Sequence, residues 1–127
     1  MIVAGFGFRR NVAAASIEAA LDAALAECGL ARSALDALAT ADDKADEPAL
    51  VAFAGHVRLP VLPVEAADMQ RVKSYARTRS PRVEALRGVP SVAETCALAA
   101  AGRSPRLICA RVANAEATCA IATGEAP

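Results

Sequence analysis

Apolar and polar positions follow two different periods along this chain, and these periods predict its secondary structure. Apolar residues 2–4 predict a first strand, and Gly5-Phe6-Gly7 predicts a sharp turn at its end, because glycine adopts backbone angles that other residues avoid. Apolar side chains then recur every three or four residues on one face of a helix that Gly29 ends. That face consists of Ile17, Leu21, Ala24, Leu25 and Cys28.

The middle of the chain continues this alternation. A short helical piece around residues 32–37 leads into a strand that ends near Thr40, and residues 48–57 have the period of a second helix. Asp46 is its expected N-cap, because a carboxylate accepts the free N–H groups of a first helical turn. The two prolines in 59–64 predict an edge strand or a strand end, which is followed by a helix up to Val72.

Residues 73–87 contain few apolar side chains and many cations, so we expect a mobile loop there. After this segment Ser91 and Glu94 form a Ser-x-x-Glu capping box, which predicts a helix that ends at Gly102. Residues 107–112 and 117–122 then predict two strands joined by a tight turn at Asn114, with a frayed tail over 124–127.

This order of elements defines the expected fold class. Strands that alternate with helices and end in a hairpin indicate an α/β protein, a three-layer sandwich with a mixed, mostly parallel sheet ending in an antiparallel hairpin. A length of 127 residues predicts a single domain over 1–127. The hydrophobic fraction of 55% with 22% charged residues excludes a disordered chain.

The amino-acid composition also argues against several classes of partner. The apolar runs are short and interrupted, which argues against a membrane span. Aromatic residues make up 3% of the chain, so recognition of nucleic acid by base stacking is not expected. The four cysteines form no CxxC pair and stand far from His56 in the sequence, which predicts neither a metal site nor a bound cofactor. Buried thiols of this kind are typical of a reducing cytoplasm.

The net charge is zero, but the charges are unevenly distributed. Residues 1–68 hold five basic and ten acidic side chains, and residues 69–127 hold nine and four, so the halves carry −5 and +5. The arginines between 71 and 87 fit a solvated surface, a small polyanionic ligand or nucleic acid, and the zero net charge argues against the last.

Three charged turns are the candidate sites. Arg9 and Arg10 follow the first strand, the acidic cluster of residues 42–47 follows the second, and residues 88–94 open the last helix. In α/β sheets ligands bind outside the carboxyl ends of the parallel strands, so we expect these turns at one rim. Lys44 stands out because a cation just before a helix N-terminus is misplaced unless an anion accompanies it.

The same three turns carry a resemblance to a known family. The chain resembles the CobE family of cobalamin biosynthesis in three motifs, which are, in this order, Gly5-Phe6-Gly7-Phe8-Arg9-Arg10, the nine residues 40–48 and the seven residues 88–94. That family is similar to the C-terminal domain of CbiG, a cobalt-precorrin-5A hydrolase. The resemblance covers about Val3 to Ile121.

The resemblance implies a cytoplasmic cobalamin (vitamin B12) biosynthesis protein that binds a polycarboxylate corrinoid or precorrin intermediate, as carrier or accessory to a pathway enzyme. Other enzymes of that pathway are then expected partners. Arg111 stands where the family often has lysine. The expected ligand contacts are Gly7, Arg9, Arg10, Asp42, Lys44, Glu47, Pro90, Ser91, Glu94 and Arg111.

The alternative is an enzyme that acts on such an intermediate. In that hypothesis Lys44 is the electrophile or general acid, and Glu47 or Glu94 is the base, because proton transfer by a placed side chain accelerates a reaction about 10²–10⁴-fold.

Overall fold

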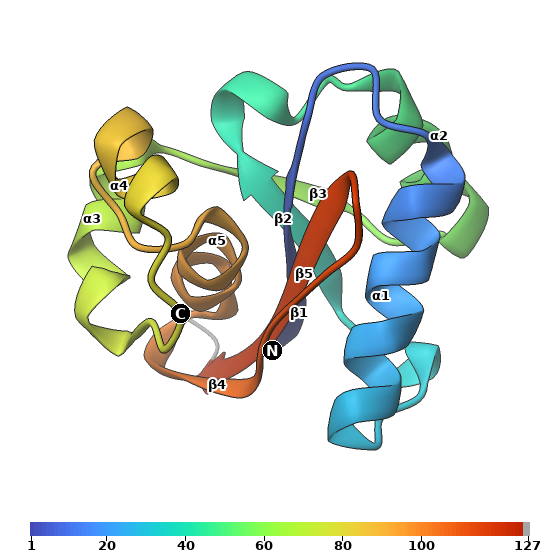
Figure 1. Cartoon of the computed structure of the whole chain (residues 1–127). Coiled ribbons are helices and arrows are strands. Elements are labelled where there is room, and N and C mark those ends of the chain that lie inside the picture. The colour runs from blue at the N-terminus through green and yellow to red at the C-terminus, as the bar shows by residue number, and fades with distance from the viewer. Residues whose placement is uncertain (126–127) are drawn as a thin grey trace.

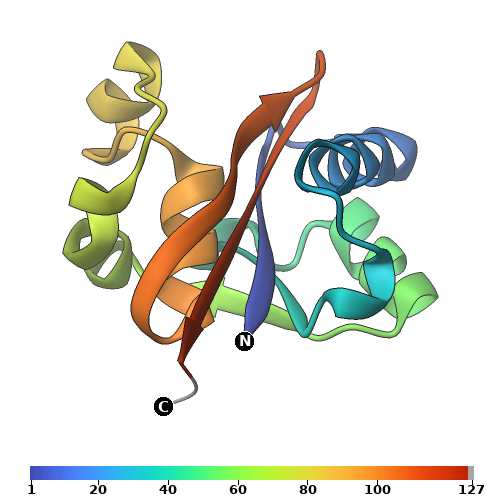
Figure 2. The ribbon, with the colours of Figure 1, turned by 90° about the horizontal axis from the view of Figure 1, so that it is seen from below.

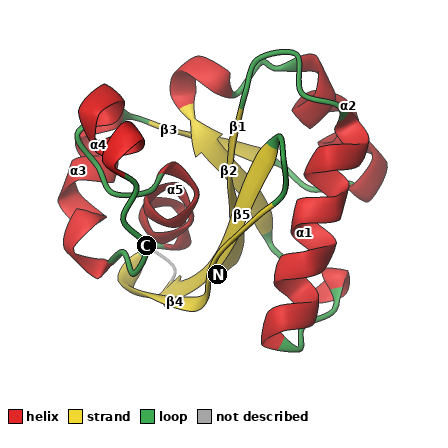
Figure 3. Ribbon diagram, viewed as in Figure 1, coloured by secondary structure: helices red, strands yellow, loops and turns green. Residues whose placement is uncertain are grey.

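A computed structural model describes residues 1–125, in which five strands form one sheet with helices on both faces (Figures 1 and 3). The strands are β1 (Ile2–Phe8), β2 (Ala37–Ala41), β3 (Val61–Val64), β4 (Arg103–Ala113) and β5 (Ala117–Glu125). The helices are α1 (Ala14–Cys28), α2 (Pro48–Val57), α3 (Ala66–Val72), α4 (Pro81–Arg87) and α5 (Val92–Ala101). Short 3₁₀ turns are η1 (Arg32–Ala34), η2 (Asp42–Lys44) and η3 (Lys73–Tyr75).

The sheet is mixed, with the order β3-β2-β1-β5-β4. Strands β1, β2 and β3 run parallel, whereas β5 pairs antiparallel with both β1 and β4. The pairing of β1 with β5 extends over seven residue pairs, from Ile2 opposite Thr123 to Phe8 opposite Ala117. The predicted α/β fold with a mixed sheet and a terminal antiparallel hairpin is therefore confirmed, and β3 is an edge strand as its prolines indicated.

Each face of the sheet carries its own hydrophobic core, which makes the expected three layers (Figure 2). On one face Phe6 and Leu38 pack with Ile17 and Leu21 of α1 and with Leu50 of α2. On the other face small side chains dominate. The residues buried there include Val3, Ala37, Ala39, Ala93, Ala97, Leu98, Ala120 and Ala122.

The two glycines of β1 have a different role from the predicted one. Gly5 and Gly7 lie within a continuous strand, so the prediction of a turn there is wrong. A Cβ atom on Gly5 would lie 2.2 Å from the carbonyl oxygen of Ala93 and 2.6 Å from the amide nitrogen of Ala97. Glycine is present because the backbone of α5 packs directly on β1. The chain turns only later, where Asn11 has a φ of 64°.

The basic segment before α5 also contains more regular secondary structure than predicted. Residues 73–75 form η3 and residues 81–87 form α4, so the expected loop is limited to residues 76–80. Ser80 is the N-cap of α4, and its hydroxyl accepts the Val83 N–H. Pro81 follows at the first helical position, where its missing N–H and fixed φ are favourable. The Ser80 N–H also donates to the Pro90 carbonyl, which ties the start of α4 to the start of α5.

Several helix ends differ from the local motifs. The bounds of α2 match the prediction, but its N-cap residue is Glu47 and not Asp46. At α5 only half of the capping box is present, because Ser91 Oγ accepts the Glu94 N–H while the Glu94 carboxylate bonds elsewhere. Gly124 and Glu125 belong to β5, so the predicted tail is wrong for these two residues, and 126–127 lie outside the described residues.

Candidate functional site

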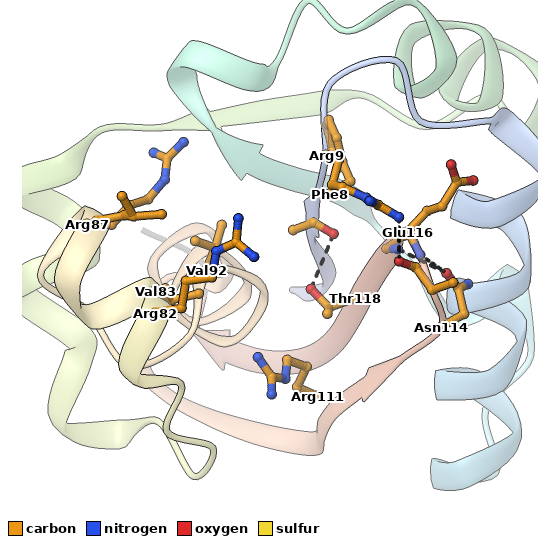
Figure 4. A pocket seen from close by; sticks show the side chains of 14 residues that line it. Phe8, Arg9, Arg82, Val83, Arg87, Val92, Arg111, Asn114, Glu116 and Thr118 are labelled. Atoms are coloured by element: carbon orange, nitrogen blue, oxygen red, sulfur yellow. Dashed lines mark hydrogen bonds between the residues drawn. The ribbon is translucent and has the colours of Figure 1, made fainter.

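A pocket of about 460 Å³ opens beside the carboxyl end of β1, between the start of β5 and α4 (Figure 4). Fourteen residues from β1, α4, α5, β4 and β5 and the adjoining turns line it. Four of them are arginines, two from α4 and one each from β4 and the turn after β1, and one is a carboxylate, Glu116. The remaining lining residues include the apolar side chains of Phe8, Val83, Leu86, Val92, Ala115 and Ala117.

The pocket arginines differ in how they are held. Arg9 donates from Nη2 to the Ala115 carbonyl at 3.0 Å, which fixes it against the β4–β5 turn. Arg87 makes a bidentate pair with Asp43, at 3.0 and 2.9 Å. Within residues 1–125, the guanidinium groups of Arg82 and Arg111 have no hydrogen-bond partner, and both lie at the hollow in Figure 4. Two cationic groups are thus available to a ligand without breaking an internal bond.

The electrostatics of the pocket favour an anion. Four guanidinium groups face one carboxylate, and Glu116 already accepts the Ser16 hydroxyl at 2.5 Å. Arginine binds carboxylate and phosphate through parallel N–H donors, and these charge-assisted bonds are stronger than neutral ones. Leu86 adds an apolar element to the rim, since 74% of its surface is exposed. The site therefore suits a molecule that has both carboxylates and an apolar body.

The Asp43–Arg87 pair joins η2 to the end of α4. The Arg87 guanidinium beside Asp43 holds the pKa of that carboxyl below its ordinary value. Arg87 and Leu86 also line a second hollow, together with Asp43, Ala66 and Met69. The end of α4 therefore lines both hollows, and the Asp43–Arg87 ion pair connects it to η2.

Lys44 and Glu47, the predicted acid and base, bind the connection between β1 and α1. Lys44 Nζ donates to the Phe8 carbonyl at 2.7 Å, and Glu47, 7% exposed, accepts the Asn11 N–H at 2.7 Å. Burial lowers the pKa of Lys44, and the cations Arg87 and Arg10 lower it further. Neither side chain lines the arginine pocket.

The structure brings the three charged turns together, as expected from the topology. Lys44 joins the second turn to the first, and the Asp43–Arg87 pair joins it to the segment that precedes the third. Of the predicted contacts, Gly7, Arg9 and Arg111 line the pocket. The other predicted contacts do not line it, and these are Arg10, Asp42, Lys44, Glu47, Pro90, Ser91 and Glu94.

Glu94 is set apart from the surface. It is 0% exposed, and so is Ser91, whose hydroxyl is occupied by the helix cap. The Glu94 carboxylate accepts hydrogen bonds from the Arg77 and Thr78 backbones, the Thr78 hydroxyl and the Arg111 N–H. The structure therefore does not bring the Glu94 carboxylate to the pocket surface.

The list of expected ligand contacts does not contain Arg82, Leu86, Arg87, Glu116 and Thr118, although all five line the pocket. Arg82 and Arg87 were considered only as part of the basic stretch 71–87, for which a small polyanionic ligand was one of three interpretations. The available signal was Ser80-Pro81, an N-cap followed by a proline at the first helical position. Recognising α4 from it would have placed Arg82 and Arg87 on one short helix.

The four cysteines are all free thiols. Burial raises the pKa of Cys96 to about 12 and that of Cys109 to about 11, which makes both poor nucleophiles at neutral pH.

No cluster of three or more histidine, cysteine or acidic residues within 1–125 is arranged to hold a metal ion. Over the same residues, no helix has the length and apolar character needed to cross a membrane.

Fold and site together define a three-layer α/β sandwich with an arginine-rich pocket at one end of its central strands. The chain belongs to the family described as Cobalamin synthesis G C-terminus, whose model matches residues 2–122, and this confirms the resemblance and a place in cobalamin biosynthesis. Protein CobE of Sinorhizobium sp is 36% identical over 121 residues, which are 95% of this chain and 79% of that protein.

Solved structures agree with this assignment. A crystal structure of CobE, a protein from the cobalamin (vitamin B12) biosynthetic pathway, aligns with a TM-score of 0.91 at 32% identity, over 100% of this chain and 92% of that one. The cobalamin biosynthesis protein chiG from Agrobacterium tumefaciens aligns with a TM-score of 0.77 at 34% identity, over 98% and 99%. A putative cobalamin biosynthesis protein G homolog from Sulfolobus solfataricus shares the fold, at 23% identity and a TM-score of 0.72, over 98% of this chain and 37% of that one.

Proposed function

We propose that this chain binds a polycarboxylate corrinoid or precorrin intermediate in the arginine pocket, as a carrier or as an accessory to a pathway enzyme. The observation that carries the proposal is a pair of guanidinium groups, Arg82 and Arg111, which have no hydrogen-bond partner among the described residues and face one hollow from α4 and β4. Membership of a cobalamin-synthesis family supplies the class of ligand.

The chemistry of the lining fits that class. A corrin-type macrocycle has an apolar ring bordered by acetate and propionate carboxylates, so it needs both cations and apolar surface. Arg82 and Arg111 would take carboxylates, while Phe8, Leu86 and Val92 would contact the ring. Each charge-assisted hydrogen bond contributes about 1.5–3 kcal/mol, and micromolar affinity requires about 8 kcal/mol. Several such bonds and the apolar contacts can supply this even after ordering costs.

The test is a titration of the purified chain with hydrogenobyrinic acid, followed by the visible spectrum of the corrinoid. We expect saturable binding at micromolar concentration and a loss of at least tenfold when Arg82 and Arg111 are both replaced by glutamine. Arg71→Gln is the matched control, because Arg71 is an exposed arginine on α3 that lies outside the pocket. Absence of binding at tens of micromolar would reject the proposal.

An enzymatic role on the same ligand is the second candidate, with Lys44 as the acid, because burial and the cations Arg87 and Arg10 lower the pKa of this lysine, and shifted pKa values are typical of functional sites. The chain would be incubated with saturating precorrin intermediate, and the absorbance and mass of the tetrapyrrole followed. Turnover that Lys44→Met abolishes while binding persists would establish this role. An unchanged tetrapyrrole would reject it.

A further inference from the structure

The Glu94 carboxylate joins two segments that are distant in sequence. One of them leads into α4, which carries Arg82, and the other contains Arg111. The Oε1 atom of Glu94 accepts the N–H groups of Arg77 and Thr78, at 2.8 and 2.9 Å. Its Oε2 atom accepts the Thr78 hydroxyl at 2.6 Å and the Arg111 N–H at 2.8 Å. A carboxylate that is 0% exposed needs partners of this kind, because burial of an unpaired charge is very costly.

The first of these segments leads directly into α4. Thr78 is two residues before Ser80, the N-cap, and four before Arg82. Ser80 in turn donates its N–H to Pro90. Glu94 and Pro90 therefore hold the chain immediately upstream of α4, so that the position of Arg82 depends on them.

The second segment is an irregular stretch of β4. The register between β4 and β5 shifts between Cys109 and Val112, which leaves Arg111 outside the regular pairing with β5. At such a bulge a backbone N–H needs another acceptor. Glu94 provides it, and the bulge directs the Arg111 side chain to the pocket (Figure 4).

We infer that Glu94 is a positioning residue that sets the placement of Arg82 relative to Arg111, so that the two guanidinium groups bind a ligand's carboxylates jointly. The inference rests on the proposed function, since the ligand is the one proposed above. Glu94 itself does not touch the ligand. It acts through the two backbone segments that it joins.

Glu94→Gln tests this with little change of shape. A glutamine side chain has one acceptor oxygen and one NH₂ donor. Its oxygen can accept hydrogen bonds from only one of the two segments, and its NH₂ group then faces an N–H donor of the other. The matched control is Thr95→Val, the next residue of α5, which is also 0% exposed and donates to Ser91 and Val92 within the helix. This control disturbs the same helix without touching either segment.

Binding of hydrogenobyrinic acid would be measured for Arg82→Ala, Arg111→Ala and the double variant, in the wild-type and in the Glu94→Gln background. We expect Glu94→Gln to weaken binding at least tenfold and Thr95→Val to change it less than twofold. We also expect the two arginine effects to be coupled in the wild type and to become independent without Glu94. Equal losses for Thr95→Val and Glu94→Gln at equal thermal stability, or a coupling that survives Glu94→Gln, would overturn the inference.

A second measurement needs no ligand, so it separates failure of this inference from failure of the proposed function. Amide hydrogen exchange reports local opening. We expect the Arg77, Thr78 and Arg111 amides to exchange at least tenfold faster in Glu94→Gln than in Thr95→Val. If Glu94→Gln does not fold, Thr78→Val serves instead, since it removes one donor to the same Oε2 atom, and we then expect the Arg111 amide to exchange about two- to fivefold faster. Unchanged exchange at these amides would reject the positioning role whether or not a corrinoid binds.

Discussion

Lys44 Nζ lies 2.7 Å from the Phe8 carbonyl oxygen and 5.4 Å from the centroid of the Phe8 ring. The same residue of β1 thus accepts a hydrogen bond from the ammonium and offers it an aromatic face. Because Arg9 is the next residue, this contact fixes the backbone from which a pocket arginine projects.

Lys44→Met should lower the free energy of unfolding by about 1–2 kcal/mol, because a hydrogen bond from a charged donor is lost while the aliphatic stem is retained. Chemical denaturation of the variant and the wild type measures this loss. Unchanged stability would show that the contact with Phe8 contributes nothing to the fold.

Asp43→Asn should tighten corrinoid binding about two- to tenfold, because Arg87 no longer has to leave a carboxylate to meet the ligand. The stability cost should stay below about 1 kcal/mol, since the Asp43 side chain is 53% exposed and such pairs contribute little. Titration and thermal unfolding of one sample test both parts. Weaker binding would show instead that the intact ion pair is needed to hold α4.

Acid should destabilise the protein partly through Glu94. Burial raises the pKa of Glu94, but the hydrogen bonds from Thr78, Arg111 and Arg77 outweigh it and hold that pKa below its ordinary value of 4.5. A lowered folded pKa means that the stabilisation is complete above pH 4.5 and is lost as the pH falls through the folded value. Asp43 contributes with the same sign.

Urea unfolding of the wild type and of Glu94→Gln at several pH values between 7 and 3 measures this contribution. The difference in stability between the two proteins should be constant down to about pH 5 and should shrink below it. A constant difference over the whole range would show that Glu94 does not change its protonation on unfolding.

Gly5→Ala should destabilise the fold by about 3 kcal/mol or more, because the added methyl group would meet backbone atoms of α5 that cannot move aside. Gly55→Ala is the matched control. A Cβ at Gly55 meets nothing within 4 Å, and in the interior of α2 alanine should stabilise by about 0.5–1 kcal/mol. Thermal unfolding of both variants measures the expected loss of stability in Gly5→Ala and the expected gain in Gly55→Ala. A folded Gly5→Ala protein of wild-type stability would show that α5 can move away from β1.

Local signals in the sequence were sufficient to predict the helices that a proline or a glycine marks at one end. Pro48 marks the start of α2, whose bounds were predicted as observed, and a periodic face together with Gly29 predicted the existence of α1 and its C-terminal end. These signals act within a few residues, so they do not depend on the rest of the fold. The order of strands and helices was likewise enough for the fold class.

The errors concern residues whose role depends on distant partners. A glycine in a turn and a glycine under a helix look alike in sequence, and only the packing of α5 on β1 distinguishes them at Gly5. Helix α4 has seven residues, too few for a clear period. At Glu94 the local capping motif competes with backbone amides at 77, 78 and 111, which only the folded chain brings near.

The pairing of β1 with β5 has a consequence for synthesis on the ribosome. Gly7 and Thr118, whose hydroxyl donates to the Gly7 carbonyl, are 111 residues apart. At about 5–20 residues per second, β1 waits roughly 6–22 s for its antiparallel neighbour. During that time the nascent chain exposes an unpaired strand edge, and the wall of the pocket that β5 forms does not yet exist. Slower translation anywhere between β1 and β5 lengthens this exposure and should therefore lower the yield of folded protein.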